Sequence, residues 1–195
     1  MTSIRLRLRD ARGTALVEFS LVVPLILVLC LGVFEVSYAL LDQHVVTKLT
    51  REGSNLISRN SSLQDAATAL RSMSSRPVDF NASARMILSV VKNVNTVGAA
   101  NFGKPVLYQR YEFGGLAASS ALQTAGAGAF GGAPDYQAAN SDNDVSLQVV
   151  NLAPNLVLPG GLLYITEIYS THQLITPFDR FGIQVPDKLY SIAYF

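Results

Sequence analysis

The sequence predicts an α+β protein that begins with a long apolar helix and continues into a domain of two further helices and a small antiparallel sheet. Three observations support this. An apolar run fills most of residues 14–41, amphipathic segments at helical spacing follow it, and segments of alternating character come after residue 105. A chain of 195 residues allows one modest domain besides the apolar helix.

The apolar run predicts a transmembrane helix over residues 14–41. Its cleanest stretch, Phe19 to Phe34, is sixteen residues long. About 20 residues are needed to cross the hydrocarbon core, so the span must use residues on one or both sides of that stretch. The residues that interrupt the run are Glu18, Ser20, Pro24, Gly32, Glu35 and Ser37.

Basic residues around the run predict its orientation. Only two basic residues, Lys48 and Arg51, follow the run closely. Four basic residues precede it, against the single acid Asp10, and these are Arg5, Arg7, Arg9 and Arg12. The bias places residues 1–13 in the cytoplasm as a short leader and residues 42–195 across the membrane. A cleaved secretory signal peptide is the alternative, but no small-x-small site follows the apolar core. Lipoprotein attachment at Cys30 is disfavoured because Leu29 stands where a small residue should precede the cysteine.

Glu18 is the most informative residue of the run. A lipid-facing carboxylate costs about 2.5–3.5 kcal/mol near the centre of a span and less near its end, and such residues usually have a partner. Counted from Thr14, Glu18 lies one turn into the helix, where the macrodipole favours a negative charge. The simpler interpretation is an acid that reaches the cytoplasmic interface. Glu35 is expected to mark the opposite interface.

The residues around Glu18 resemble a known family. Gly13 is followed at the fifth position by Glu18 and at the sixth by Phe19, which resembles the processing signature of type IV-like prepilins. The wider string from Gly13 to Leu27 is similar to the TadE-like pseudopilins of the tight-adherence (Flp) pilus system. The resemblance continues through Gly32 and Glu35 to the Thr50-Arg51-Glu52-Gly53 segment and covers about the first 55 residues. Thr14 departs from classical type IV pilins, which place Phe after the scissile glycine, and this leaves N-methylation open.

The resemblance implies a pilin-like fold and a function. It implies that a prepilin peptidase cleaves between Gly13 and Thr14 and that Glu18, next to Phe19, pairs with the new amine of Thr14 in a neighbouring subunit. The protein would be a minor pilin or pseudopilin in the bacterial inner membrane, with its C-terminal domain in the periplasm. Its partners would be other pilins or pseudopilins, the pilus assembly platform and membrane lipids. The alternative is an uncleaved, single-pass periplasmic scaffold or binding protein.

Beyond the membrane, three helical segments are expected. The first helix continues with a stripe of Leu41, Val45, Leu49 and Leu56 and stops at Asn60-Ser61-Ser62. Ser61 and Gln64 have capping-box spacing before a second helix, whose apolar face would be Leu63, Ala66, Ala67, Leu70 and Met73. After Pro77, Asn81 would cap a third helix with a face of Ala84, Ile87, Leu88 and Val91.

The later segments predict strands over 107–113, 145–149, 162–174 and 188–195. Pro159-Gly160-Gly161 supplies a turn, so 145–149 and 162–174 are expected to form a hairpin with a longer loop. Residues 114–144 are rich in Gly, Ala and Ser and are expected to form a flexible surface loop.

Residues suited to catalysis are sparse. His44 and His172 fit no ligand or catalytic spacing, and Asp142-Asn143-Asp144 lacks the glycine and distal Glu of a calcium loop. The glycines of residues 126–132 precede no helix with a lysine, so they do not form a phosphate-binding loop. The single Cys30 excludes an internal disulfide, and the formal net charge of +1 gives no indication of a nucleic-acid partner. We therefore expect no enzyme, no cofactor and no metal site.

Overall fold

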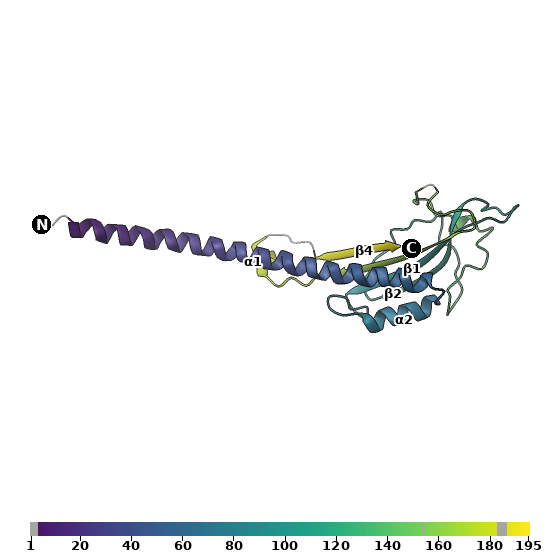
Figure 1. Ribbon diagram of the computed structural model, residues 1–195, viewed down its shortest axis with the longest axis horizontal. Coiled ribbons are helices and arrows are strands. Elements are labelled where there is room, and N and C mark those ends of the chain that lie inside the picture. Colours follow the sequence, from purple (N-terminus) through teal and green to yellow (C-terminus); the bar gives the residue numbers. More distant parts are fainter. Residues whose placement is uncertain (1–3, 154, 183–186) are drawn as a thin grey trace. The chain divides into compact units, whose positions relative to one another are not determined.

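The computed structural model describes residues 4–153, 155–182 and 187–195 and confirms the α+β class (Figure 1). Its helices are α1 (Ile4–Ser58) and α2 (Leu63–Met73), and its strands are β1 (Ala84–Asn93), β2 (Pro105–Gly114), β3 (Leu162–Thr171) and β4 (Lys188–Tyr194). Two short 3-10 turns are η1 (Val145–Leu147) and η2 (Pro177–Phe181). The chain divides into two compact units. The first holds Met1–Leu40 and Leu174–Val185, and the second holds Leu41–Gln173 and Pro186–Phe195.

The first helix is a continuous 55-residue element with Pro24 inside it. Its segment Gly13–Ser58 is long and apolar enough to cross a membrane, and none of its most apolar window is buried within the protein. Large apolar side chains such as Leu21 and Leu25 are more than half exposed, as a lipid-facing helix requires. Because the helix already begins at Ile4, Glu18 lies one turn from the helix N-terminus only if residues 1–13 are removed.

The junction between α1 and α2 contains the predicted stop, but the cap of α2 lies one residue later than the sequence indicated. α1 ends at Ser58 and Asn60 takes a left-handed backbone conformation, as the predicted stop requires. The cap of α2 is Ser62, not Ser61: the Ser62 hydroxyl accepts from the Asp65 amide at 3.1 Å. The predicted apolar face is buried at Leu63, Ala66, Ala67 and Leu70, but Met73 is half exposed.

The predicted third helix is wrong, because residues 84–93 form strand β1. Residues 86–91 are all buried, so both faces of the strand are covered. A short, continuously apolar run matches helical spacing by chance, and its β-branched residues fit a central strand better. Asn81 caps no helix and instead donates its amide to the Asp79 carboxylate within a turn.

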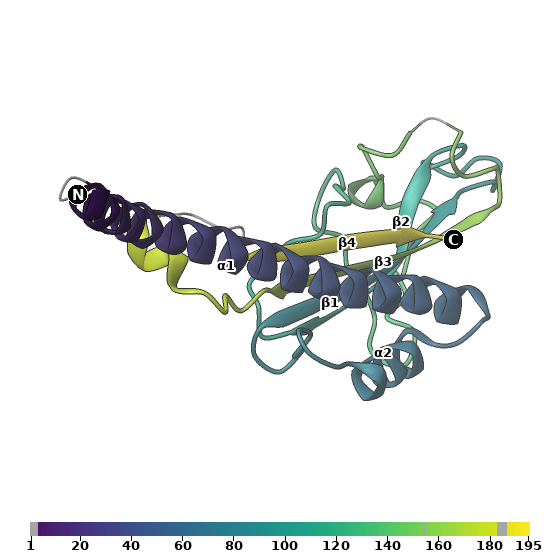
Figure 2. The same ribbon diagram turned by 60° about the vertical axis from the view of Figure 1, so that its left-hand side comes forward.

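The sheet has the order β2-β1-β3-β4, and every neighbouring pair is antiparallel (Figure 2). Strands β2, β3 and β4 confirm three of the four predicted strand segments. The fourth, 145–149, is wrong: it begins with η1, whose cap is Asp144. The predicted hairpin is therefore wrong as well, and β3 lies between β1 and β4.

The core of the second unit has one apolar cluster on each face of the sheet. On one face, α2 and the 41–58 part of α1 cover Met86, Leu88 and Ile168. On the other face, Leu122, Leu147 and neighbouring residues of the long connection between β2 and β3 cover Val91 and Ile165. The buried stripe of α1 is Val46, Leu49, Thr50, Gly53, Ser54 and Ile57. Of the predicted stripe only Leu49 is fully buried, so the helix is rotated by about one residue from the expected orientation.

The segment 115–144 contains no helix or strand, only isolated bridges such as Gln109↔Gln137. Several of its residues are nonetheless buried, including Leu122 and Ala138. Its flexibility stays a prediction.

Candidate functional site

Gly13 and Thr14 lie on an exposed part of α1. A Cβ added to Gly13 would meet no atom within 4 Å, so packing inside this chain does not require glycine here. A requirement for glycine at this position must therefore come from another molecule or from backbone freedom.

Glu18 and Phe19 are also exposed, and the side chain of Phe19 has 68% of its surface accessible. Thr14 and Glu18 are four residues apart, so they lie on the same face of the helix. Within the described residues, Glu18 has no hydrogen-bond or ion-pair partner. Its carboxylate is exposed and therefore accessible to water, lipid or another molecule.

Glu35 has the opposite environment, which the sequence did not reveal. Its side chain is 1% exposed, and its carboxylate accepts from the amide of Thr176 at 2.8 Å and the amide of Ile175 at 3.2 Å. The Thr176 hydroxyl donates to the same oxygen at 2.6 Å. Several donors to one carboxylate make a charge tolerable away from water. The sequence predicted that Glu35 marks an interface but did not identify its hydrogen-bond donors, because these lie about 140 residues later in the chain.

The segment that holds these donors packs against the same helix. Phe178, in η2, is 8% exposed, and a Cβ added to Gly32 would lie 4.0 Å from its ring at Cζ, an ordinary contact distance. Gly32 and Glu35 are three residues apart and thus neighbours on the helix surface. The segment around residues 174–178 is therefore fixed to α1 by one polar and one apolar contact.

A second buried carboxylate, Glu167 on β3, organises the domain. It is 0% exposed, accepts from the Ala121 amide at 2.7 Å and from the Tyr190 hydroxyl at 3.1 Å, and also binds the Ser120 hydroxyl. Burial, together with the nearby Glu167 charge, raises the pKa of Tyr190 well above its usual range, because both disfavour the phenolate. No local pattern pointed to this residue, because Glu167 stands in an apolar strand and its partners Ala121 and Tyr190 lie on a loop and another strand.

Arg110 on β2 extends the network around Glu167. It donates to the Ser120 hydroxyl at 3.1 Å and to the Ser89 hydroxyl at 3.4 Å. Burial lowers the pKa of Arg110, while the carboxylates of Glu112 and Glu167 oppose that shift. The network joins the 115–144 segment to the sheet.

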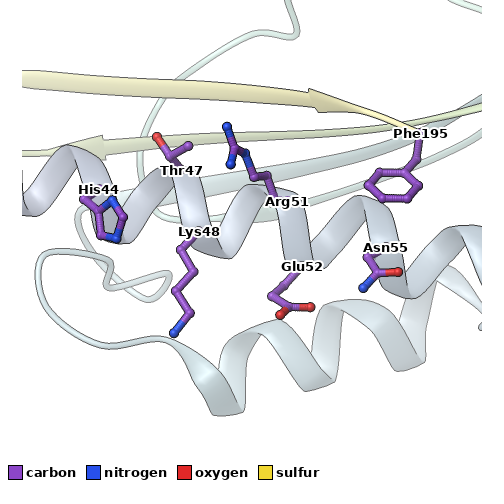
Figure 3. Close-up of a pocket in the computed structure, with 7 residues that line it drawn as sticks. All are labelled: His44, Thr47, Lys48, Arg51, Glu52, Asn55 and Phe195. Carbon is purple, nitrogen blue, oxygen red and sulfur yellow. The ribbon is translucent and has the colours of Figure 1, made fainter.

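A shallow groove lies along α1 in the domain, lined by His44, Thr47, Lys48, Arg51, Glu52, Asn55 and Phe195 (Figure 3). Lys48 and Glu52 project to one side of the helix, whereas Thr47 and Arg51 project to the other. The other histidine, His172, is buried and its Nδ1 lies 2.6 Å from the Asp42 carboxylate.

The Asp142-Asn143-Asp144 turn uses its side chains for separate contacts within the protein. The Asp142 carboxylate lies 3.0 Å from the Lys92 ammonium and accepts from Thr96, which lowers the pKa of Asp142. Asp144 caps η1, and the Asn143 side chain accepts from the Ala100 amide. These contacts fix the end of the 115–144 segment to the neighbouring turn.

An exposed apolar helix that could cross a membrane, followed by a small α+β domain, is consistent with the class of membrane-anchored proteins. Within this class, residues 13–55 match the family model of TadE-like proteins, which confirms the resemblance over that segment. The match begins at the predicted cleavage glycine and ends inside α1, so the sheet and its loops lie outside it. No curated protein and no solved structure matches the chain significantly.

Proposed function

We propose that this protein is a minor pilin or pseudopilin of a tight-adherence (Flp, type IV-like) pilus, processed by a prepilin peptidase after Gly13. The observation that carries the proposal is the match to TadE-like proteins, which begins at Gly13 and includes Glu18 and Phe19. The exposed apolar helix supports a membrane anchor, from which such a subunit would enter or support the filament.

In this mechanism, cleavage creates a new amine at Thr14 and places Glu18 one turn from the start of the shortened helix. The Glu18 carboxylate then pairs with the Thr14 amine of a neighbouring subunit. In a low-dielectric interface a matched pair is far less costly than either charge alone, so pairing favours a correctly aligned neighbour. The exposure of Glu18 along the helix leaves the carboxylate accessible for this contact.

The proposed location is the bacterial inner membrane, with the leader in the cytoplasm and the domain in the periplasm. The partners are the prepilin peptidase, other pilins or pseudopilins, the assembly platform and membrane lipids. We assign a structural rather than a catalytic role. The buried Glu167, the carboxylate at the centre of the domain's polar network, is already bound by groups of the domain.

Processing is tested by N-terminal sequencing of the protein extracted from membranes of cells that hold the cognate peptidase. We expect the mature chain to begin at Thr14 and Gly13→Ala to slow cleavage. Glycine lowers the cost of unwinding a helix by about 0.5–1 kcal/mol relative to alanine, so a slowing of about two- to fivefold is expected from this effect alone. Gly32→Ala, in the same helix, is the matched control and should be processed normally. Met1 or Thr2 as the only start would contradict the proposal.

The second candidate is an uncleaved, membrane-anchored periplasmic scaffold or binding protein. One observation favours it: α1 is unbroken from Ile4 across the Gly13–Thr14 bond, which a peptidase must unwind locally before hydrolysis. The sequencing experiment separates the two candidates, since a scaffold keeps its original N-terminus.

A further inference from the structure

We propose that the segment 174–178, here called the interfacial loop, lies in the outer lipid–water interface and that Glu35 holds it there. The loop would contact lipid directly and fix the depth of the helix in the bilayer. This inference goes beyond pilus assembly, because it concerns how the anchor sits in the membrane before any partner binds.

The level of the loop follows from the length of the helix. A hydrocarbon core of about 30 Å corresponds to about 20 helical residues at a rise of about 1.5 Å each. Counted from Thr14, these residues reach Val33. Gly32 and Glu35 therefore lie at the outer boundary of the apolar core, and the contacts of the loop are made with these two residues.

The loop is attached at that level by its backbone. Glu35 accepts from the amides of Ile175 and Thr176, and the next residue is Pro177, which has no amide hydrogen. Irregular backbone is costly near hydrocarbon because its polar groups lack water, so satisfying these amides lowers the cost of placing the loop there. Phe178 fills the adjacent position against Gly32.

The side chains that remain exposed suit a lipid interface. Ile175 has 59% of its surface accessible, and Pro177 is exposed beside it in the chain. Arg180 is exposed two residues after Phe178, and an arginine close to a bilayer surface can bind lipid phosphates. At the level of Glu35 the helix also exposes Phe34 and Val36, so apolar surface continues from the span to the loop. This continuity favours lipid over a second protein as the occupant.

The absence of tryptophan from the chain makes a direct test possible. The full-length Ile175→Trp protein is reconstituted in nanodiscs that contain phosphatidylcholine brominated near the glycerol end of its acyl chains. We expect the tryptophan emission to be blue-shifted and to lose most of its intensity through quenching by bromine. Phe34→Trp, which places a tryptophan on the helix at the level of the interface, is the reference and should behave in the same way. Val97→Trp, at an 87% exposed position of the domain, is the control and should keep its intensity.

The role of Glu35 is tested by adding Glu35→Ala to the Ile175→Trp protein. Release of the loop should reduce the quenching and shift the emission to longer wavelength, while Phe34→Trp carrying the same change stays quenched. An Ile175→Trp signal that is no more quenched than Val97→Trp would overturn the lipid contact. A blue shift that appears only with several protein copies per disc, without bromine quenching, would also overturn it and identify a second protein as the occupant. Unchanged quenching in the Glu35→Ala protein would overturn the role of Glu35.

Discussion

Two carboxylates on one apolar helix illustrate how burial and partners decide the role of a residue. Glu35 is buried and bound by two amides and a hydroxyl, so the chain itself compensates its charge. Glu18 is exposed and has no such partner among the described residues. An ionised group at the end of a membrane span usually has a partner, so the difference supports our proposal that Glu18 contacts another molecule.

Glu18→Gln tests this role at the scale of one residue. The substitution keeps the shape of the side chain but leaves a neighbour's Thr14 ammonium unpaired in a dry interface. Breaking one half of a buried pair costs about 3–5 kcal/mol, which is more than about 100-fold in association. The variant should still insert and be cleaved, but it should fail to crosslink to its pilus partners or to support piliation.

Glu52→Gln is the matched control, because it removes one negative charge from the same helix within the domain. It should assemble normally. If Glu18 merely reaches water at the cytoplasmic interface, its charge contributes at most about 1 kcal/mol through the helix dipole. Wild-type crosslinking and piliation by Glu18→Gln would leave that simpler interpretation standing.

Among the elements, the contact of α1 with β3 depends on Gly53. A Cβ at this position would lie 2.7 Å from the Thr166 methyl carbon, 2.9 Å from its hydroxyl oxygen and 3.0 Å from Leu70 Cδ1. The missing side chain therefore lets the helix approach the sheet closely. This explains a glycine that otherwise weakens a helix interior by about 1 kcal/mol.

Gly53→Ala should consequently destabilise the domain although alanine is the better helix former. Overpacking costs about 1–3 kcal/mol and the gain in helix propensity returns up to about 1 kcal/mol, so a net loss of about 1 kcal/mol is expected. Thermal unfolding of the nanodisc-embedded protein, followed by tyrosine circular dichroism, measures it. The Gly53→Ala/Thr166→Ala double variant should be less destabilised than the two single changes added together, because it removes the two closest atoms. Strict additivity would show that the contact does not limit the packing.

The sequence predicted the elements whose signals are local and missed those that depend on distant contacts. The apolar run, the stop at Asn60 and strands β2, β3 and β4 follow from composition, turn residues and alternation. Strand β1 was mistaken for a helix because burial on both faces removes the alternation that identifies a strand. In the candidate site, the residues from Gly13 to Phe19 form a compact motif that the sequence displays. The donors to Glu35 and Glu167 were missed because they lie far away in the chain.

At the scale of the whole molecule, the distribution of basic residues decides on which side of the membrane the domain folds. Only Lys48 and Arg51 follow the apolar run closely, and both line the groove of the domain. The larger basic group, Arg5, Arg7, Arg9 and Arg12, lies in the leader, and its side chains lie outside the described residues. Retention of the more basic flank in the cytoplasm would place everything after the span outside it.

A fusion of alkaline phosphatase after Phe195 tests this orientation, because that enzyme is active only where its disulfides form, outside the cytoplasm. We expect the phosphatase fusion to be active. A second fusion, in which a reporter that works only in the cytoplasm takes the place of the phosphatase, should be inactive. Replacing the four leader arginines by glutamine leaves Lys48 and Arg51 as the main basic residues near the span, so phosphatase activity should fall as part of the population inverts. Gln substitutions at Lys48 and Arg51 are the matched control and should not lower it. An active cytoplasmic reporter on the unaltered chain would place the domain in the cytoplasm, where neither a periplasmic pilus subunit nor a periplasmic scaffold could function.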